Sequence, residues 1–297
     1  MRETVAAYKT GWMRLCSEVM GINRRNLELI YPHNPRQNFP NVDDKIICKR
    51  LLEQGGISVP KTLALFDTQL SLRQGKKLLE NLEQFALKPN AGSGGLGVVL
   101  IKEKKSSHFL CHDGQLLSAE DLFWHIQNII AGVFSLDNLT DVAIIEELLE
   151  PDEDLAKLSY KGVPDVRIIV LKDKPVMAML RLPTSKSKGK ANLHQGALGV
   201  GVDLETGVTT NSIYQGEFNT HHPDTGMGLI GVQIPEWDPI LEQSSKIPAL
   251  VGLNYVGIDF VIDRRSGLKV LEVNARPGLQ IQLANFKGLR PVVQEAV

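Results

Sequence analysis

The sequence predicts an α+β fold built on antiparallel sheets. Helical and extended segments are mixed along its 297 residues, and the second half contains three pairs of apolar segments joined by turns. These turns lie at residues 173–174, 205–207 and 263–267. A hairpin requires antiparallel pairing, so a simple doubly wound parallel sheet is not expected.

The first half of the chain is predicted to begin with helices. Residues 1 to about 20 have the apolar spacing of an amphipathic helix, and residues 31–40, rich in Pro and Asn, indicate a loop. A second helix follows, which Asn41 or Asp43 can cap and which Gly55 ends. The next predicted elements are a strand after Pro60, a helix over 71–84, strands over 85–89 and 98–101, a helix over 122–131 and a buried strand over 142–149.

The second half is predicted to consist mainly of hairpins. Its expected elements are strands over 165–172 and 175–182, two strands around the turn at 205–207, a helix near 239–250, and a last hairpin over 255–263 and 268–273. Side chains of this last hairpin carry the first functional signal.

Composition excludes several classes of protein. The formal net charge is −1, from 33 basic and 34 acidic residues, so no nucleic-acid partner is expected. No apolar run has membrane-spanning length, and no apolar signal core begins the chain. The three cysteines form no Cys-x-x-Cys pair, and Cys111, between two nearby histidines, is interpreted as part of a short strand rather than a metal site. A reducing, cytoplasmic location is therefore expected.

Three oxygen-bearing side chains, Asp259, Glu272 and Asn274, lie on the last predicted hairpin. If Asp263 pairs with Leu268 across the turn, Asp259 lies opposite Glu272, and Asn274 shares a face with Glu272 because side chains alternate along a strand. Facing carboxylates repel each other unless a cation lies between them. Because Mg²⁺ prefers oxygen ligands, the pattern predicts a magnesium site.

The alternative is that these acidic side chains lie on a solvated face of the sheet. The neighbouring residues argue against it, because both strands are strongly apolar and buried acids in such strands usually have a partner. These neighbours are Val256, Ile258, Phe260, Ile262, Val270, Leu271 and Val273.

A glycine-rich loop at residues 90–97 is the second functional signal. Its glycines allow backbone N–H groups to approach an anion closely, because no Cβ atom intervenes. It is no Walker A motif, since no Gly-Lys-Ser/Thr follows, and a strand rather than a long helix comes after it. Lys88 directly before the loop would project towards a bound phosphate. Lys45 is a second candidate, for which a surface position on its helix is the alternative.

The ordered set of motifs resembles the ATP-grasp superfamily over about residues 41–285. Within it, the chain is most similar to the RimK-type glutamate ligases and the α-L-glutamate ligase-like proteins. The motifs that carry the resemblance are Asp44-Lys45, Lys88-Pro89 with the glycine loop, Glu146-Glu147, Asp165-Val166-Arg167, Asn192, Asp259 and the Glu-x-Asn-x-Arg-Pro element at residues 272–277.

The resemblance implies two α+β lobes that clasp ATP between two sheets. It divides the chain into residues 1–42, a short helical segment and loop in place of a full domain before the grasp; 43–149, the first lobe with the glycine-rich loop; and 150–297, the second lobe with the metal site. Because that additional domain often shapes the substrate site, a partner subunit or a second copy of the chain could supply the missing wall.

The resemblance also implies the roles of individual residues. The nucleotide would be contacted by Lys45, Lys88, the loop residues Gly92, Ser93, Gly94, Gly95 and Gly97, the hinge residues Glu146, Glu147 and Leu148, and by Asp165, Lys190 and Asn192. Mg²⁺, with Mn²⁺ as an alternative, would be held by Asp259, Glu272 and Asn274. The catalytic centre would be lined by Arg167, Arg181 and Arg276.

The implied activity is that of an ATP-dependent carboxylate–amine ligase. A carboxylate is a poor acyl donor, so ligases of this type first phosphorylate it and then let an amine displace the phosphate. The expected reaction adds an amino acid, glutamate-like by resemblance, to a peptide, a protein or a small amine. The alternatives are a kinase-like phosphotransferase and a non-catalytic ATP-binding regulatory protein.

Several of these residues have a second interpretation. Arg167 alternates with apolar neighbours and shares a face with Asp165, so it can also form a structural pair with a buried acid. Arg181 can be an ordinary sheet residue. The basic run that includes Lys190 can be a solvated loop, or it can close over an anionic substrate.

Overall fold

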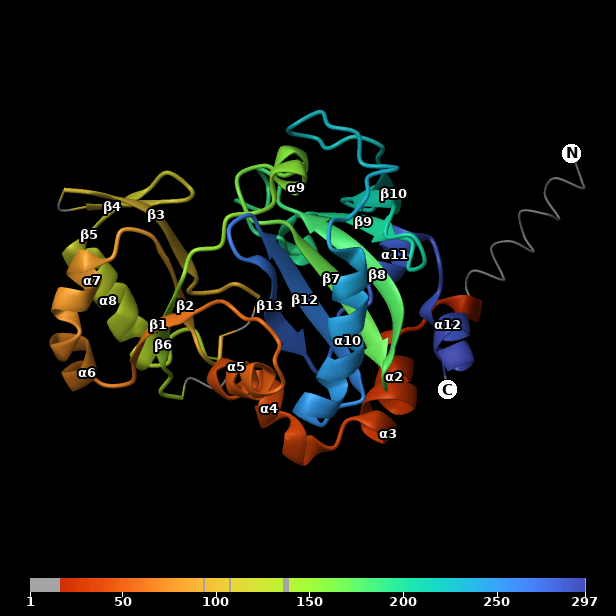
Figure 1. Cartoon of the computed structure of the whole chain (residues 1–297), viewed down its shortest axis with the longest axis horizontal. Helices are drawn as coiled ribbons and strands as arrows, with labels where there is room; N and C mark the ends of the chain where they lie inside the picture. The colour runs from red at the N-terminus through yellow and green to blue at the C-terminus, as the bar shows by residue number, and fades with distance from the viewer. Residues whose placement is uncertain (1–16, 93, 107, 136–138, 297) are drawn as a thin grey trace, which may run out of the picture.

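A computed structural model of the chain, which describes residues 17–92, 94–106, 108–135 and 139–296, confirms the α+β fold. Most of the amphipathic helix predicted over residues 1–20 lies outside the described residues. Two lobes lie side by side, and each is built on its own antiparallel sheet (Figure 1). The prediction that hairpins exclude a doubly wound parallel sheet is therefore confirmed.

The first lobe contains a six-stranded sheet in the order β1-β6-β2-β3-β4-β5. Its strands are β1 (Thr62–Phe66), β2 (Phe85–Pro89), β3 (Val99–Lys105), β4 (His108–Cys111), β5 (Leu116–Ser118) and β6 (Ala143–Glu146). Its helices are α6 (Gln69–Gln74), α7 (Lys76–Asn81) and α8 (Ala119–Ile130). Apolar side chains from these helices and from the sheet form a common core.

One predicted helix of this lobe is divided in two. The helix expected over residues 71–84 is interrupted at Gly75, where α6 ends and α7 begins. A Cβ atom on Gly75 would lie 2.3 Å from the Phe66 ring, so only glycine lets the chain pass β1 this closely. By contrast, α8 begins with the predicted capping box of Ser118 and Asp121.

The second lobe contains a seven-stranded sheet in the order β11-β10-β9-β8-β7-β12-β13. Its strands are β7 (Asp165–Leu171), β8 (Lys174–Leu182), β9 (Leu198–Val202), β10 (Thr209–Tyr214), β11 (Glu217–Phe218), β12 (Tyr255–Asp263) and β13 (Gly267–Asn274). Its helices are α9 (Glu153–Leu158), the 3₁₀ turn η3 (Leu193–Gln195), α10 (Trp237–Val251), α11 (Ile281–Asn285) and α12 (Leu289–Ala296).

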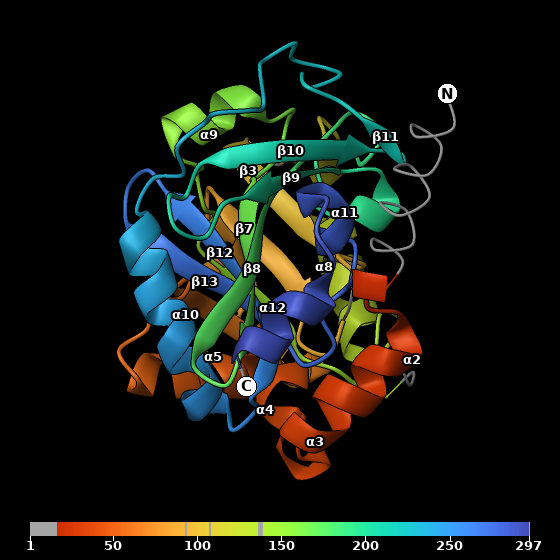
Figure 2. The ribbon, with the colours of Figure 1, turned by 90° about the vertical axis from the view of Figure 1, so that its right-hand side faces the viewer.

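This second sheet is covered on both faces (Figure 2). Ile168 and Ile258 point to the core under α10, whereas Ile169 and Tyr255 point to the opposite core, where α11 and α12 pack. Alternate residues of β7 and β12 therefore pack into different hydrophobic cores. Towards one end of the second face, polar side chains such as Asp259 replace the apolar ones.

The N-terminal segment is more helical than predicted. It contains α2 (Ile22–Arg25), the π-helix η1 (Asn26–Ile30), α3 (Tyr31–His33), the 3₁₀ turn η2 (Arg36–Asn38) and α4 (Pro40–Asp43), and α5 (Lys45–Gln54) follows it at the start of the first lobe. The loop prediction for residues 31–40 is thus wrong over most of its length. Pro32 and Pro40 each stand in a first helical turn, where the missing N–H group costs nothing.

Buried side-chain amides hold this segment against the second lobe. Asn34 donates to the Tyr255 carbonyl at 2.7 Å and accepts from the Tyr255 N–H at 2.9 Å. Gln282 of α11 makes the same two-way contact with the backbone of Met20. Apolar periodicity does not record contacts between residues this far apart in the sequence, so the pattern over residues 31–40 indicates a loop.

The helix α5 begins one residue later than a cap at Asp43 and three residues later than a cap at Asn41 would give. Asp44, rather than Asn41 or Asp43, caps it by accepting the Ile47 N–H at 2.8 Å, and Gly55 ends it as predicted. None of the described helices combines the length and the apolar character that a membrane-crossing segment needs.

Candidate functional site

The hairpin of β12 and β13 places Asp259 opposite Glu272, as predicted. The turn assumed for this pairing is wrong, because Asp263 pairs with Gly267 rather than with Leu268. The Asp263 carboxylate tightens the turn by accepting the Ser266 N–H at 2.9 Å and its hydroxyl at 2.7 Å. A β-bulge at Leu271, between the Asp259 and Phe260 pairs, then restores the expected register.

Asp259 is 2% exposed and both of its carboxylate oxygens are engaged by arginines. Arg167 of β7 donates to the two oxygens at 2.6 Å each, and Arg181 of β8 donates to Oδ2 at 2.8 Å. The Asn274 amide lies 3.5 Å from the same oxygen. Arg167 therefore forms the structural pair with a buried acid that was its alternative interpretation, and that acid, Asp259, is also a predicted metal ligand.

Asp165 and Arg181 complete a buried network of two acids and two arginines. Arg181 Nη2 donates to Asp165 Oδ2 at 2.7 Å. Burial raises the pKa of Asp165 to about 6, although Arg181 acts in the opposite direction. Burial also opposes the ionisation of Asp259, but Arg167 and Arg181 outweigh it and hold the pKa of Asp259 below its ordinary value.

The donor set on the hairpin fits Mg²⁺ by its chemistry. It consists of two carboxylates and one amide. Among the described residues, Glu272 forms no ion pair, and neither its carboxylate nor the Asn274 side-chain oxygen accepts a hydrogen bond. The described part of the chain contains no group of three His, Cys, Asp or Glu side chains that could hold a metal ion, and the third donor on the hairpin is an amide. Asp259 Oδ1 accepts a single hydrogen bond, from Arg167, so this oxygen keeps a lone pair with which it can join such a set.

On the first lobe, Lys88 lies in a buried cluster with Glu146 and Lys49. Lys88 Nζ is 2.7 Å and Lys49 Nζ is 2.5 Å from the Glu146 carboxylate, whose side chain is 2% exposed. Burial opposes the ionisation of Glu146, but the two lysines hold its pKa below the ordinary value. Two cations share one anion here, so the cluster carries a surplus positive charge.

Lys45 lies at the start of the glycine-rich loop rather than on the surface of its helix. Its Nζ donates to the carbonyl oxygens of Asn90 at 3.0 Å and Gly92 at 2.6 Å. Burial lowers the pKa of Lys45 below its ordinary value, although the Glu272 carboxylate acts in the opposite direction. Glu272 lies on the other lobe, so its electrostatic effect on Lys45 acts across the junction of the lobes.

The glycine-rich loop is also contacted by the basic loop of the second lobe. Lys190 Nζ donates to the Gly95 carbonyl at 3.0 Å, and Gln195 Nε2 donates to the Gly94 carbonyl at 2.7 Å. Asn192 contacts the same Gly94 oxygen at 3.5 Å. Ser93 lies outside the described residues. Segments that are about 100 residues apart in the sequence thus meet across the two lobes.

The predicted hinge has two acidic residues in different surroundings. Glu146 is buried between two lysines, whereas Glu147 is partly exposed, accepts the Lys61 N–H at 2.8 Å and lies 3.8 Å from Lys269 of the second lobe. The Leu148 carbonyl accepts from Arg265 at 2.8 Å. Of the two carboxylates, Glu147 is the one at the junction of the lobes.

Arg276 lies apart from the other two predicted arginines. Its guanidinium lies 4.3 Å from the centre of the Phe39 ring, and its Nη1 is 3.6 Å from Asp43. Its contacts are therefore with the N-terminal segment and not with Asp259. Arg167 and Arg181, by contrast, are brought together as predicted.

Three residues of the site were missed by the sequence analysis. Lys49 follows Lys45 by one helical turn, which was the available signal for a shared face. Asp141 accepts the Ala91 N–H at the start of the glycine-rich loop at 3.0 Å, and Gln195 holds Gly94. The last two are single polar residues in loops, and no spacing rule identifies them.

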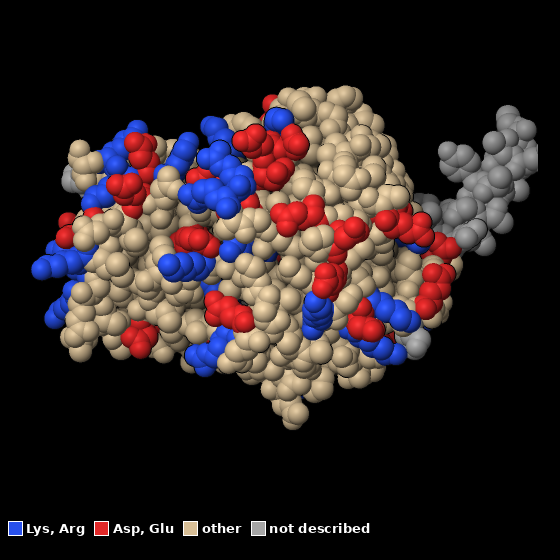
Figure 3. Space-filling model, in the orientation of Figure 1, with Lys and Arg blue, Asp and Glu red and all other residues tan. Residues whose placement is uncertain are grey.

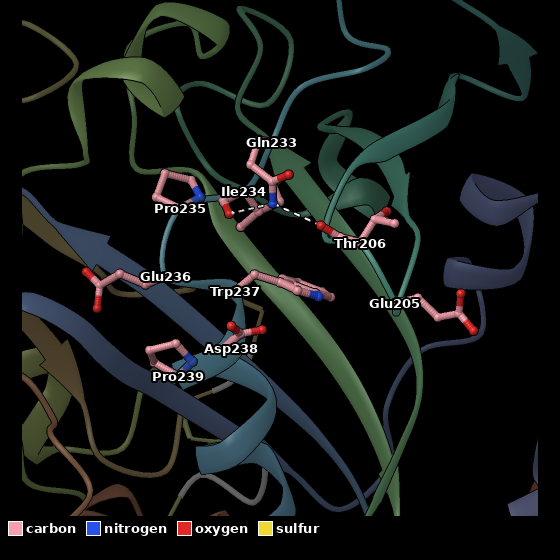
Figure 4. A pocket seen from close by; sticks show the side chains of 9 residues that line it. All are labelled: Glu205, Thr206, Gln233, Ile234, Pro235, Glu236, Trp237, Asp238 and Pro239. Atoms are coloured by element: carbon pink, nitrogen blue, oxygen red, sulfur yellow. Dashed lines mark hydrogen bonds between the residues drawn. The ribbon is translucent and has the colours of Figure 1, made fainter.

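The surroundings of the site carry charges of both signs. Acidic and basic side chains are mixed over one face, with a group of basic side chains near the junction of the lobes (Figure 3). A separate hollow of about 460 Å³ lies at the start of α10, where Gln233 donates to the Thr206 and Ile234 carbonyls (Figure 4). None of the residues that line it is a predicted site residue.

Relatives with curated names cover most of this chain. It is 26% identical over 247 residues to a probable α-L-glutamate ligase of Histophilus somni (strain 2336), covering 82% of this chain and 58% of the relative. It is 24% identical over 258 residues to one of Psychromonas ingrahamii, covering 85% and 62%. The chain thus spans about three fifths of the length of these relatives.

The fold also resembles that of solved structures. A biotin carboxylase complex from Campylobacter jejuni aligns with a TM-score of 0.52 at 12% identity, covering 86% of this chain and 46% of the other. At this identity the likeness concerns the fold alone. The model of the sugar-transfer-associated ATP-grasp family matches residues 24–296, nearly the whole described chain. The protein is therefore a member of the sugar-transfer-associated ATP-grasp family.

Proposed function

We propose that this chain is an ATP-dependent ligase that activates a carboxylate as an acylphosphate and joins it to an amine. The observation that carries the proposal is that the glycine-rich loop, bound by Lys45 at Gly92, is also contacted by Lys190 of the other lobe. A phosphate group and a divalent cation bind together, so a phosphate loop together with an oxygen donor set suits magnesium nucleotide chemistry. Relatives named probable α-L-glutamate ligase support the reaction class.

The nucleotide is proposed to lie between the two sheets. Its phosphates would be bound by the cations and backbone amides at the glycine-rich loop, namely Lys45, Lys88, Gly92, Ser93, Gly94, Gly95, Gly97, Lys190 and Asn192. Its adenosine would be bound by the hinge, Glu146, Glu147 and Leu148, with Asp165 nearby. The surplus positive charge of the Lys49–Glu146–Lys88 cluster supports an anion at this place.

Mg²⁺, or Mn²⁺, would be held by Asp259, Glu272 and Asn274, and when bound it would neutralise charge on the phosphates. In the first half-reaction, a carboxylate oxygen attacks the γ-phosphorus and the bond to ADP breaks. In the second, the amine nitrogen attacks the acyl carbon, inorganic phosphate leaves and the nitrogen loses a proton. Arg167 and Arg181 would neutralise the negative groups that meet at this centre.

The boundaries proposed for this enzyme are a helical segment over residues 1–42 and lobes over 43–149 and 150–297. A glutamate-like amino acid is the proposed carboxylate substrate, and a peptide, protein or small amine the acceptor. A second copy of the chain or a partner subunit is a proposed source of further substrate contacts.

The test is a screen for ADP release with Mg²⁺ and ATP. Single acids, single amines and their pairs are compared, and ADP that requires both an acid and an amine, with a new amide in the product, supports the proposal. ADP formation without consumption of an amine would indicate a phosphotransferase instead. ATP binding without ADP formation from any acid–amine pair would indicate a non-catalytic protein.

A further inference from the structure

A hollow of about 410 Å³ lies between the N-terminal segment and the end of β13. Three arginines line it, and we call it the arginine hollow. Arg25 and Arg36 come from the N-terminal segment, and Arg276 comes from the residues after β13. The remaining lining includes the apolar or aromatic side chains Ile30, Tyr31 and Phe39. This volume is within the range that small-molecule sites occupy.

The positive charge of the arginine hollow is poorly balanced. Arg276 lies 3.6 Å from Asp43, and both side chains of this pair are about half exposed. Within the part of the chain that the structure describes, neither Arg25 nor Arg36 forms an ion pair with a carboxylate. Three guanidinium groups thus share one exposed acidic neighbour. The surplus of about two positive charges favours an anionic ligand.

Arg25 is only 9% exposed, and hydrogen bonds hold its guanidinium in place. Its Nη1 donates to the Pro277 carbonyl at 2.8 Å, and its Nη2 donates to Asn26 Oδ1 at 2.8 Å. Burial, together with the charge of Arg276, lowers the pKa of Arg25 below its ordinary value, although Tyr255 acts in the opposite direction. Arg25 and Arg276 line the same hollow, so two like charges share a partly desolvated place, which costs free energy unless an anion binds there.

The arginine hollow is connected to the glycine-rich loop. Arg276 lies 3.6 Å from Asp43, and the next residue, Asp44, accepts from the Asn90 side chain at the start of that loop at 2.9 Å. The Arg276 guanidinium is oriented by its contact with the Phe39 ring at 4.3 Å. A ligand with one end in the hollow could thus direct its other end towards the glycine-rich loop.

We propose that the arginine hollow binds the acidic end of the substrate, a small molecule with two or more carboxylates on a short carbon skeleton. Two negative charges match the surplus of the hollow, arginine forks pair well with carboxylates, and Ile30 and Tyr31 can contact the skeleton. The N-terminal segment then supplies a wall of the substrate site from within the chain. This inference rests on the proposed function, because it assigns the hollow to that enzyme's substrate.

The first experiment measures binding by the full chain without ATP, using isothermal titration calorimetry. The probes are citrate, succinate, glycerol 3-phosphate and inorganic phosphate. Citrate is expected to bind more tightly than succinate, and its affinity should fall with added salt. Failure of both carboxylates to bind would overturn the proposal. Tighter binding of glycerol 3-phosphate or phosphate would also overturn it, in favour of a phosphate site.

The second experiment locates the bound probe. Arg36→Ala, an exposed position, should weaken citrate binding about tenfold, whereas Arg24→Ala on the same segment, paired with Glu28 outside the hollow, should leave it unchanged. Unchanged melting temperatures of both variants establish that the fold is intact. Citrate should also slow phenylglyoxal modification of Arg36 and Arg276 relative to Arg24, as read by mass spectrometry. Equal effects at Arg24 and Arg36 would contradict the assignment.

The two proposals fail in different ways. If citrate binding depends on Arg36 but no acid–amine pair gives ADP release, the arginine hollow is an anion site and the proposed ligase activity is wrong. ADP release from a polycarboxylate with the same KM in Arg36→Ala as in the wild type would retain the ligase and reject the arginine hollow as its substrate site.

Discussion

Asp259 and Glu272 lie directly opposite each other although the turn between their strands is tighter than the apolar pattern suggests. The β-bulge at Leu271 compensates for the shorter turn, so the two carboxylates keep their register. Asp259 is neutralised by Arg167 and Arg181, whereas Glu272 has no ion pair among the described residues. The surroundings of the two carboxylates therefore differ, and a bound cation would neutralise mainly the charge of Glu272.

The first prediction concerns this donor set. Glu272→Gln and Asn274→Ala remove one candidate ligand each, and both should raise the Mg²⁺ concentration needed for half-maximal ADP release by at least about tenfold. Melting temperatures should change little, because both side chains are only partly buried. The exposed Glu205→Gln variant is the control. Wild-type magnesium dependence in both variants would rule out a metal site on this hairpin.

The second prediction concerns Glu146 and the pH dependence of stability. Lys88 and Lys49 hold the pKa of Glu146 below its ordinary value of 4.5 in spite of burial. Its stabilising effect is therefore complete above about pH 4.5 and is lost as the pH falls through the lowered pKa. Glu146→Gln should reduce the free energy of unfolding at pH 7 by roughly 3–5 kcal/mol, because it leaves two buried lysines without their anion.

The measurement is urea unfolding of the wild type and of Glu146→Gln between pH 3 and pH 8. The difference in unfolding free energy should shrink as the pH falls below about 4.5. Glu103→Gln is a matched control, because Glu103 also pairs with a lysine but is 56% exposed. A difference that stays constant over the whole pH range would show that the charge of Glu146 is not what stabilises the cluster.

The third prediction concerns the return from the glycine-rich loop. Gly97 has a φ of +73°, and a Cβ atom there would lie 2.7 Å from the Phe134 ring. Its carbonyl is also bonded to His125 at 2.8 Å. Gly97→Ala should therefore lower the free energy of unfolding by about 1–3 kcal/mol and weaken ATP binding. Thermal melting and ATP titration check these effects.

The control for Gly97 is Gly228→Ala. Gly228 is not among the glycines with positive φ and has no atom within 4 Å of the added Cβ, so alanine there should be neutral or slightly stabilising. Equal behaviour of the two variants would contradict the strained geometry assigned to the loop.

The fourth prediction concerns the attachment of the N-terminal segment. Asn34 is 2% exposed and bonds both backbone groups of Tyr255. Asn34→Ala leaves these groups unsatisfied and should lower the free energy of unfolding by about 1–3 kcal/mol. Asn23→Ala, at an exposed position of α2, should have no comparable effect. If denaturant unfolding finds the two variants equally stable, Asn34 does not anchor the segment.

The larger elements could be predicted from the sequence because their signals are local. The hairpin turns, the capping box at Ser118 and the glycines that end α5 each act over a few residues. The facing of Asp259 and Glu272 was predicted from a turn one residue too long, and the prediction holds because the β-bulge at Leu271 compensates for the shorter turn. The glycine-rich loop and Lys88 were identified by composition and position alone.

Other features depend on contacts between distant parts of the chain. The division at Gly75 follows from the Phe66 ring, and the helical turns over residues 31–40 depend on Asn34 bonding Tyr255. Whether Arg167 faces a substrate or a buried acid could not be decided by alternation along one strand. Pairing of β7 with β12 decides it, because Arg167 then lies opposite Asp259.

The sequence by itself determined the α+β class, the family resemblance and the candidate donor set, since these rest on short-range spacing and local turn chemistry. Tertiary structure alone decided that Lys45 lies at the loop, that Lys49 shares Glu146 with Lys88, and that Arg276 joins the N-terminal segment. The reason is physical: burial and charge pairing depend on which elements meet in space, and periodicity records only the face on which a side chain lies.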